Sequence, residues 1–93
     1  MSKRKDRNLI EFGNVIRAHR DNLTLKNNSR SFFIDDRIKK GLLNYNEISE
    51  KTLMNIENGY NLPSLSTLKI LAVALEVDFF KLLKDLYEHI PIE

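Results

Sequence analysis

The sequence contains no cysteine among its 93 residues, so disulfide bonds, thiolate zinc sites and cysteine nucleophiles are excluded. Tryptophan is also absent, and only three glycines and two prolines are present, which leaves few turns for a fold made of many strands. No apolar run approaches the length of about 18–20 residues that crosses a bilayer. The first residues also lack the apolar segment of a signal peptide. These absences predict a mainly helical protein of the cytoplasm that does not associate with membranes.

The length and composition fit one small folded domain. A chain with 42% hydrophobic and 30% charged residues is too apolar for disorder and large enough for one core. We expect the domain to span residues 9–90, between a basic tail over residues 1–8 and a short tail over residues 91–93.

Charge is unevenly distributed along the chain. Residues 1–40 carry eleven Lys or Arg against five Asp or Glu, whereas residues 41–93 carry four against eight. A basic half on a small domain attracts polyanions, and nucleic acid is the commonest of these in the cytosol. The tail over residues 1–8 is therefore either a frayed end or a basic arm that adds phosphate contacts or enters a minor groove.

Apolar residues recur at helical spacing in five segments, and none of them shows the alternation of a strand. Ser29, Ser49 and Asp78 are expected to cap helix starts, while Gly41 and Gly59 follow helix ends. The expected helices cover residues 9–21, 29–40, 49–58, 64–76 and 79–89. The fourth helix has an apolar face made of Leu65, Leu68, Leu71, Ala72 and Leu75.

Few residues are suited to catalysis or metal binding. His19 and His89 fall in separate helices without metal-ligand spacing around them. The adjacent carboxylates of Asp35 and Asp36 point about 100° apart on a helix, so they do not form a dyad. The sequence therefore predicts no enzyme activity, no catalytic residue, no metal, no cofactor and no small-molecule ligand.

The most specific pattern is ISEKTLMNIENGYNLPSLSTLKILAVALEV, residues 48–77. A Ser-capped helix ends there in I-E-x-G, a loop leads to Pro-Ser, and L-x-x-L-A-x-A-L-x-V follows. Upstream, residues 12–20 read FGNVIRAHR and contain G-x-x-I-R-x-x-R. Over about residues 9–86 the chain resembles the Cro/CI-like helix-turn-helix family, also called the XRE family. The resemblance implies an all-α, five-helix, lambda-repressor-like DNA-binding domain.

The chain departs from the family between the second and third helices. Family members join these helices by a tight turn of about four residues, whereas the segment from Lys39 to Ile48 is several residues longer. The second helix also lacks the family's L-A-x-x-x-G pattern. We therefore expect an extended connection, in which either the second helix runs longer or Leu42 to Asn46 form an additional loop. The sequence does not decide whether this connection binds DNA or a partner.

The resemblance implies two sets of DNA contacts. The residues expected at base edges are Glu50, Lys51, Thr52 and Asn55. The residues expected at the DNA backbone are Ser29, Arg30, Ser31, Asn58, Tyr60 and Asn61. Glu50 either accepts a hydrogen bond from a cytosine amino group or stabilises the helix N-terminus.

Arg20 and Glu57 are expected to form a structural ion pair. In the family, an Arg of the first helix pairs with the Glu of I-E-x-G and ties the recognition helix to the rest of the domain. A carboxylate and a guanidinium can form two parallel hydrogen bonds, which fix orientation as well as distance. This role is favoured over a direct phosphate contact by Arg20.

The last helix carries more apolar residues than one inward face can use. Once the core has been supplied, four residues remain for a dimer interface: Phe80, Tyr87, Ile90 and Ile92. The alternative is that this helix folds back and buries both of its sides on the first helix.

Taken together, these features predict a sequence-specific DNA-binding transcriptional regulator that binds operator DNA as a homodimer. Small proteins of this kind include phage-type repressors, restriction–modification controllers and mobile-element regulators. The alternative is a protein–protein adaptor, an anti-repressor or an antitoxin component on the same fold.

Overall fold

The computed structural model describes residues 7–92, and within them every regular element is a helix. The elements are α1 (Arg7–Asp21), α2 (Arg30–Lys39), α3 (Glu50–Glu57), α4 (Leu65–Ala74) and α5 (Phe79–Leu86), followed by a short 3-10 helix, η1 (Tyr87–His89). The prediction of an all-α protein is confirmed for this part of the chain. No helix within residues 7–92 is long and apolar enough to cross a membrane.

The first helix begins earlier than the sequence suggested. α1 starts at Arg7, so the last two residues of the expected basic tail are helical. Residues 1–6, the rest of that tail, lie outside the described residues, as does Glu93 at the other end.

Side-chain caps account for the starts of four helices. The oxygens of Ser29, Ser49 and Ser64 each accept a hydrogen bond from the backbone N–H three residues later, at 3.0–3.2 Å. A carboxylate oxygen of Asp78 does the same for α5 at 3.0 Å. A cap of this kind stabilises a helix by about 1 kcal/mol. The caps expected from the sequence at Ser29, Ser49 and Asp78 are confirmed.

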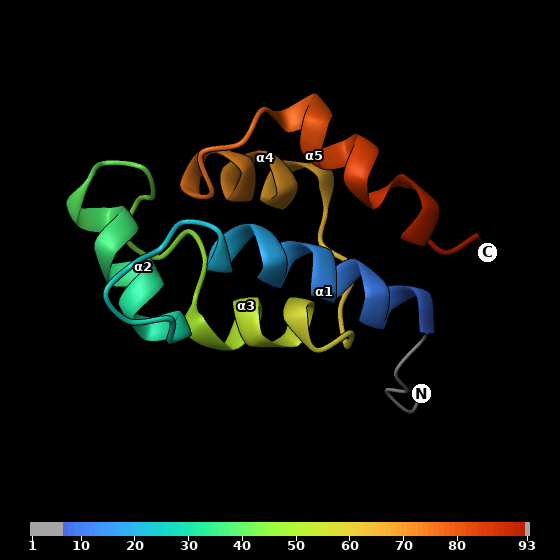
Figure 1. Cartoon of the computed structure of the whole chain (residues 1–93), viewed down its shortest axis with the longest axis horizontal. Coiled ribbons are helices and arrows are strands. Elements are labelled where there is room, and N and C mark those ends of the chain that lie inside the picture. The colour runs from blue at the N-terminus through green and yellow to red at the C-terminus, as the bar shows by residue number, and fades with distance from the viewer. Residues whose placement is uncertain (1–6, 93) are drawn as a thin grey trace.

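The helices form a layered arrangement with α1 at its centre (Figure 1). In this view α3 lies on one side of α1 and both α4 and α5 lie on the other, while α2 covers the end of the molecule away from the C-terminus. The core between them is formed mainly by the fully buried residues Phe12, Ile16, Phe33, Leu53, Ile56, Leu71, Leu82 and Leu86. Because α1 contacts both layers, it is the element against which α3 is positioned.

The burial of two residues differs from what the sequence predicts. Leu65 was expected on the inward face of α4, but it is 67% exposed. It is the first residue of α4 and lies at the edge of the core, where the next residue, Ser66, is also exposed. Arg37, in contrast, is only 1% exposed although it is charged.

Arg37 connects α2 to the end of α4. Its Nη1 donates to the carbonyl oxygen of Ala74 at 3.2 Å and to Glu76 Oε2 at 2.6 Å, and its Nη2 donates to Asp36 Oδ2. The last carbonyls of a helix have no partner within the helix, so the guanidinium satisfies one that would otherwise be buried without a bond. Its hydrogen bonds and ion pairs with two carboxylates offset the cost of burying its charge.

Candidate nucleic-acid interface

α3 has one buried face and one exposed polar face. Leu53 and Ile56 are each 1% exposed and attach the helix to the core. The four residues expected at base edges lie on the other faces: Glu50, Lys51 and Thr52 are exposed and Asn55 is half-buried. An amphipathic helix of this type can present polar side chains to a groove while its apolar side stays packed.

The first turn of α3 is held by its cap. Ser49 Oγ accepts from the backbone N–H of Thr52 at 3.0 Å and donates to Thr52 Oγ1 at 2.9 Å. The Thr52 hydroxyl therefore accepts within the cap and keeps its own proton for an external acceptor. This proton can bond to a DNA phosphate oxygen only when DNA lies against the first turn of α3.

The segment after α3 folds back onto it. The backbone N–H groups of Tyr60 and Asn61 both donate to the carbonyl oxygen of Asn55, at 2.8 and 3.3 Å. These bonds hold Tyr60 and Asn61 next to the helix, whose C-cap is Asn58, so three of the expected backbone-contacting residues lie together. Gly59 permits the turn because its φ of 83° lies in the left-handed region.

The end of α3 is attached to α1 by an Arg–Glu pair with two hydrogen bonds. Arg20 Nε donates to Glu57 Oε2 at 2.7 Å, and Arg20 Nη2 donates to Glu57 Oε1 at 2.9 Å. The side chain of Glu57 has no exposed surface and that of Arg20 is 6% exposed. The structure thus brings these two residues together in the geometry of a buried, oriented ion pair.

Two further arginines bind the same carboxylate. Arg30 Nε donates to Glu57 Oε1 at 2.9 Å, and Arg17 Nε lies 3.5 Å from the same oxygen. Arg17 also donates from Nη2 to Asn58 Oδ1 at 2.8 Å. Three guanidinium groups therefore surround one buried carboxylate, which leaves two positive charges in excess where α1, α2 and α3 meet.

This arginine cluster (Arg17, Arg20 and Arg30 around Glu57) alters the expectation for Arg30. The sequence assigned Arg30 to the DNA backbone alone, but its Nε is bonded to Glu57. Its side chain is 24% exposed, and its two terminal nitrogens make no hydrogen bond to the described residues. Arg30 therefore supports α3 with one nitrogen while two others are available to an anion.

Sequence reasoning missed Arg17 as a member of this cluster. Its side chain is 36% exposed, the highest value of the three arginines. Arg17 lies three residues before Arg20, so the two share one face of a helix. That spacing was the signal that could have placed Arg17 beside Glu57.

The remaining backbone-contacting candidates lie at the start of α2. Both Ser29 and Ser31 are exposed, and their hydroxyl oxygens are 3.4 Å apart. Ser29 Oγ is already engaged by the cap of α2, so Ser31 has the less constrained hydroxyl. Helix N-termini favour anions because their first N–H groups are unpaired.

Apolar side chains are exposed on α5 and on the segment that follows it, residues 87–92. Leu82 and Leu86 are fully buried, whereas Phe80 and Tyr87 are each 75% exposed. The other two residues expected at a dimer interface are also exposed: Ile90 at 38% and Ile92 at 97%. α5 therefore packs one face on the core, and its exposed residues, Phe80, Lys81 and Lys84, are one apolar and two charged side chains.

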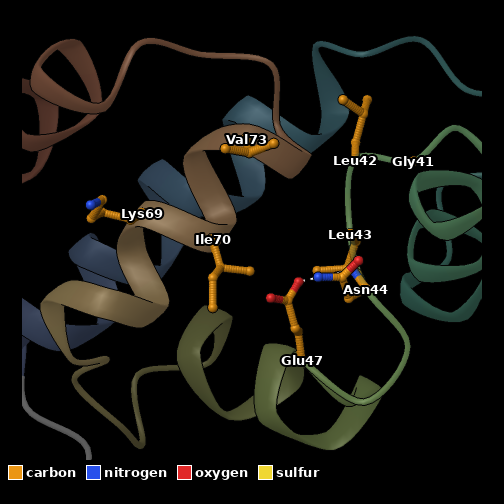
Figure 2. Close-up of a pocket in the computed structure, with 8 residues that line it drawn as sticks. All are labelled: Gly41, Leu42, Leu43, Asn44, Glu47, Lys69, Ile70 and Val73. Carbon is orange, nitrogen blue, oxygen red and sulfur yellow. Dashed lines mark hydrogen bonds between the residues drawn. The ribbon is translucent and has the colours of Figure 1, made fainter.

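A shallow pocket of about 310 Å³ lies between the α2–α3 connection and α4 (Figure 2). Its walls combine aliphatic side chains, including Ile70 and Val73 from α4, with the polar residues Asn44, Glu47 and Lys69. Glu47 accepts a hydrogen bond from the backbone N–H of Asn44 at 2.8 Å, as the dashed line in Figure 2 shows. The pocket has no pair of a nucleophile and a base, and residues 7–92 contain no group of three or more His, Cys, Asp or Glu that could hold a metal.

Comparisons with known proteins give no match: no protein-family model, no curated protein and no solved structure resembles this chain closely enough to count as one.

Proposed function

We propose that this protein is a sequence-specific DNA-binding transcriptional regulator with a lambda-repressor-like arrangement of its five helices. The observation that carries the proposal is the exposed polar face of α3 with Lys51 and Thr52 in its first turn, opposite the buried Leu53 and Ile56. A helix that enters the major groove needs apolar anchors on one side and polar side chains near its N-terminus on the other.

The arginine cluster supports the same proposal. Its two excess positive charges lie beside α3 and at the start of α2, and the terminal nitrogens of Arg30 make no hydrogen bond to the described residues. Arginine binds phosphate well because its planar fork can donate two parallel hydrogen bonds. In this function Arg30, Ser31 and Asn58 contact phosphates, while Lys51 and Asn55 contact base edges.

The protein acts as a homodimer that forms through α5. The supporting observation is the uncovered apolar surface of Phe80, Tyr87, Ile90 and Ile92. Such a surface on a small protein usually marks an interface. To contact half-sites one helical turn apart on DNA, a two-fold dimer has to place its two copies of α3 about 34 Å apart. It regulates by blocking or recruiting polymerase at the operator, and it requires no cofactor.

The decisive experiment is the selection of bound sequences from a pool of random duplex DNA, followed by binding titrations. We expect an enriched motif with two-fold symmetry, and we expect affinity to fall steeply with salt. Lys51→Ala is expected to lose the preference for the motif. Lys69→Ala, which removes an exposed lysine of α4, is the matched control and is expected to select the same motif. A folded protein that binds no duplex even at low salt would instead indicate the protein–protein adaptor, whose partner would use the α5 surface.

A further inference from the structure

A second groove, of about 440 Å³, lies between α2 and the connection that follows it. The side chains of Ile34, Ile38 and Ile48 contribute its apolar lining, and Lys39 and Tyr45 also border it. Ser49, the cap of α3, belongs to the same groove. The groove therefore ends next to the first turn of α3, where the proposed base contacts begin.

The outer face of α2 leads into this groove. Ser31, Asp35 and Lys39 are exposed and are spaced four residues apart, so they lie along one side of the helix. Ser31 is at the end of α2 that carries the proposed phosphate contacts, and Lys39 is at the other end. One exposed stripe thus joins the start of α2 to the groove.

Tyr45 is held in an exposed position by a tight turn. The backbone N–H of Glu47 donates to the carbonyl oxygen of Asn44 at 3.1 Å, and Asn46 has a φ of 72°. These features form a four-residue turn with Tyr45 and Asn46 at its centre, and Asn is one of the few residues that tolerate this φ. The Tyr45 side chain is 79% exposed. The carboxylate of Glu47 is committed to the Asn44 backbone on the opposite side of the connection, where it lines the pocket against α4 (Figure 2).

We propose that Lys39 and Tyr45 form an additional contact to the phosphate backbone of duplex DNA, next to the bases contacted by α3. This inference rests on the proposed function, because it assumes that the first turn of α3 lies in the major groove. A lysine ammonium and a tyrosine hydroxyl are both common donors to DNA phosphates. The connection of ten residues, 40–49, thereby lengthens the contact with DNA beyond that of a tight turn.

Asp35 limits the strength of this contact. Its carboxylate is exposed on the same stripe as Lys39 and borders the same groove, so it repels a phosphate that approaches them. Removal of its charge should therefore strengthen DNA binding, which is the opposite of the effect expected from Lys39→Ala.

The test measures the affinity and its salt dependence for the selected duplex with purified full-length variants. We expect Lys39→Ala to weaken binding about three- to tenfold and to lower the slope of log affinity against log salt by about 0.9. Tyr45→Phe removes only the hydroxyl and should weaken binding by a smaller factor without a change in slope. Asp35→Asn should tighten binding. All three side chains are exposed, so the melting temperatures should stay at that of the wild type.

Lys69→Ala is the control, because this exposed lysine belongs to α4 and lines the pocket on the other side of the connection. It should leave affinity and slope unchanged. A wild type that selects a motif while Lys39→Ala, Tyr45→Phe and Asp35→Asn all bind as it does would overturn this inference and leave the proposed function intact. A Lys39→Ala variant that changes the preferred base at one position would also overturn it, because Lys39 would then contact a base. A folded wild type that binds no duplex would overturn both.

Discussion

Gly13 of α1 lies so close to the carbonyl oxygen of Glu57, at the end of α3, that a methyl group does not fit between them. The two helices therefore cross backbone to backbone at this point. The close crossing brings the end of α1 within reach of Glu57, so that Arg20 can bond to its carboxylate. Gly13 thus determines how closely α3 packs against α1.

Gly13→Ala is expected to lower the free energy of unfolding by about 3 kcal/mol, because the new Cβ overlaps backbone atoms that cannot rotate away. Urea unfolding measures the change. Gly41→Ala is the control: an added Cβ there meets no atom within 4 Å, and only the φ of 75° opposes it, at a cost of about 1 kcal/mol. Equal losses in the two variants would show that the crossing is not tight.

Arg20→Ala is expected to destabilise the fold by about 3 kcal/mol, because it removes two bonds from a carboxylate that has no exposed surface. Arg17 and Arg30 remain beside Glu57, so the loss should fall at the low end of the range for a broken buried pair. For a domain of this size the loss corresponds to a fall in melting temperature of at least about 12 °C. Lost DNA binding with an unchanged melting temperature would make Arg20 a direct DNA contact instead.

Lys51→Ala and Asn55→Ala should each weaken the preferred operator by about 1–3 kcal/mol and relax the preference at one base pair. Arg30→Ala should weaken all sequences alike and lower the salt slope by about one. It should also lower the melting temperature, because Glu57 loses a bond of 2.9 Å. Titrations with operator and random duplexes separate these effects. Equal losses on both duplexes for Lys51→Ala would contradict its role at a base edge.

The double variant Tyr87→Asp with Ile90→Asp should convert the proposed dimer into a folded monomer. Neither side chain belongs to the buried core, and Tyr87 is 75% exposed, so the charges should act mainly on the interface. Analytical ultracentrifugation at micromolar concentration measures the change. Val73→Asp, at a residue of α4 that is 56% exposed, is the control and should stay dimeric. A monomeric wild type, or a double variant that dimerises with unchanged affinity, would exclude α5 as the interface.

Acid should destabilise the protein through two half-buried carboxylates, those of Asp36 and Asp85. A hydrogen bond from Arg37 lowers the pKa of Asp36, and hydrogen bonds from Lys81 and then His19 lower the pKa of Asp85. Because each folded pKa lies below the ordinary value of 3.8, the stabilisation is complete above that value and is lost as the pH falls through the folded pKa. Urea midpoints measured from pH 7 to pH 3 should therefore drop below about pH 4. The difference between wild type and Asp36→Asn should shrink over the same interval, and a constant difference would contradict the assignment.

The helices were largely predictable because their boundaries depend on local chemistry. Serine and aspartate side chains cap helix starts through bonds that span three residues, and Gly41 and Gly59 adopt positive φ immediately after two helix ends. These signals lie within a few residues of each other in the sequence. Leu65 was misjudged because helical spacing gives the side on which a residue lies, but not where along a helix the neighbouring elements stop.

The contacts of charged residues were only partly predictable. The link between Arg20 and Glu57 came from a family resemblance, whereas Arg17 and Arg30 join them through the relative placement of three helices. Arg37 lies four residues after the buried Phe33 and therefore lies on the same inward side of α2. Burial of its charge costs desolvation free energy, so a charged residue is not expected there. That cost is offset by Asp36, Glu76 and the carbonyl of Ala74, two of which are far away in the sequence. Partners of this kind depend on tertiary structure, which no local pattern encodes.

In α3 the residues that anchor the helix to the core differ from the residues of its exposed first turn. Those that hold the helix in place, Leu53, Ile56 and Glu57, are buried, and those in its first turn, Glu50, Lys51 and Thr52, are exposed, with Thr52 Oγ1 also accepting a hydrogen bond from the Ser49 cap. If the first turn contacts DNA as proposed, three adjacent codons can change to favour a new operator while the anchoring residues stay the same. DNA specificity and stability then depend on different residues. A small regulator of this design can therefore change its preferred operator through a series of variants that all remain stably folded.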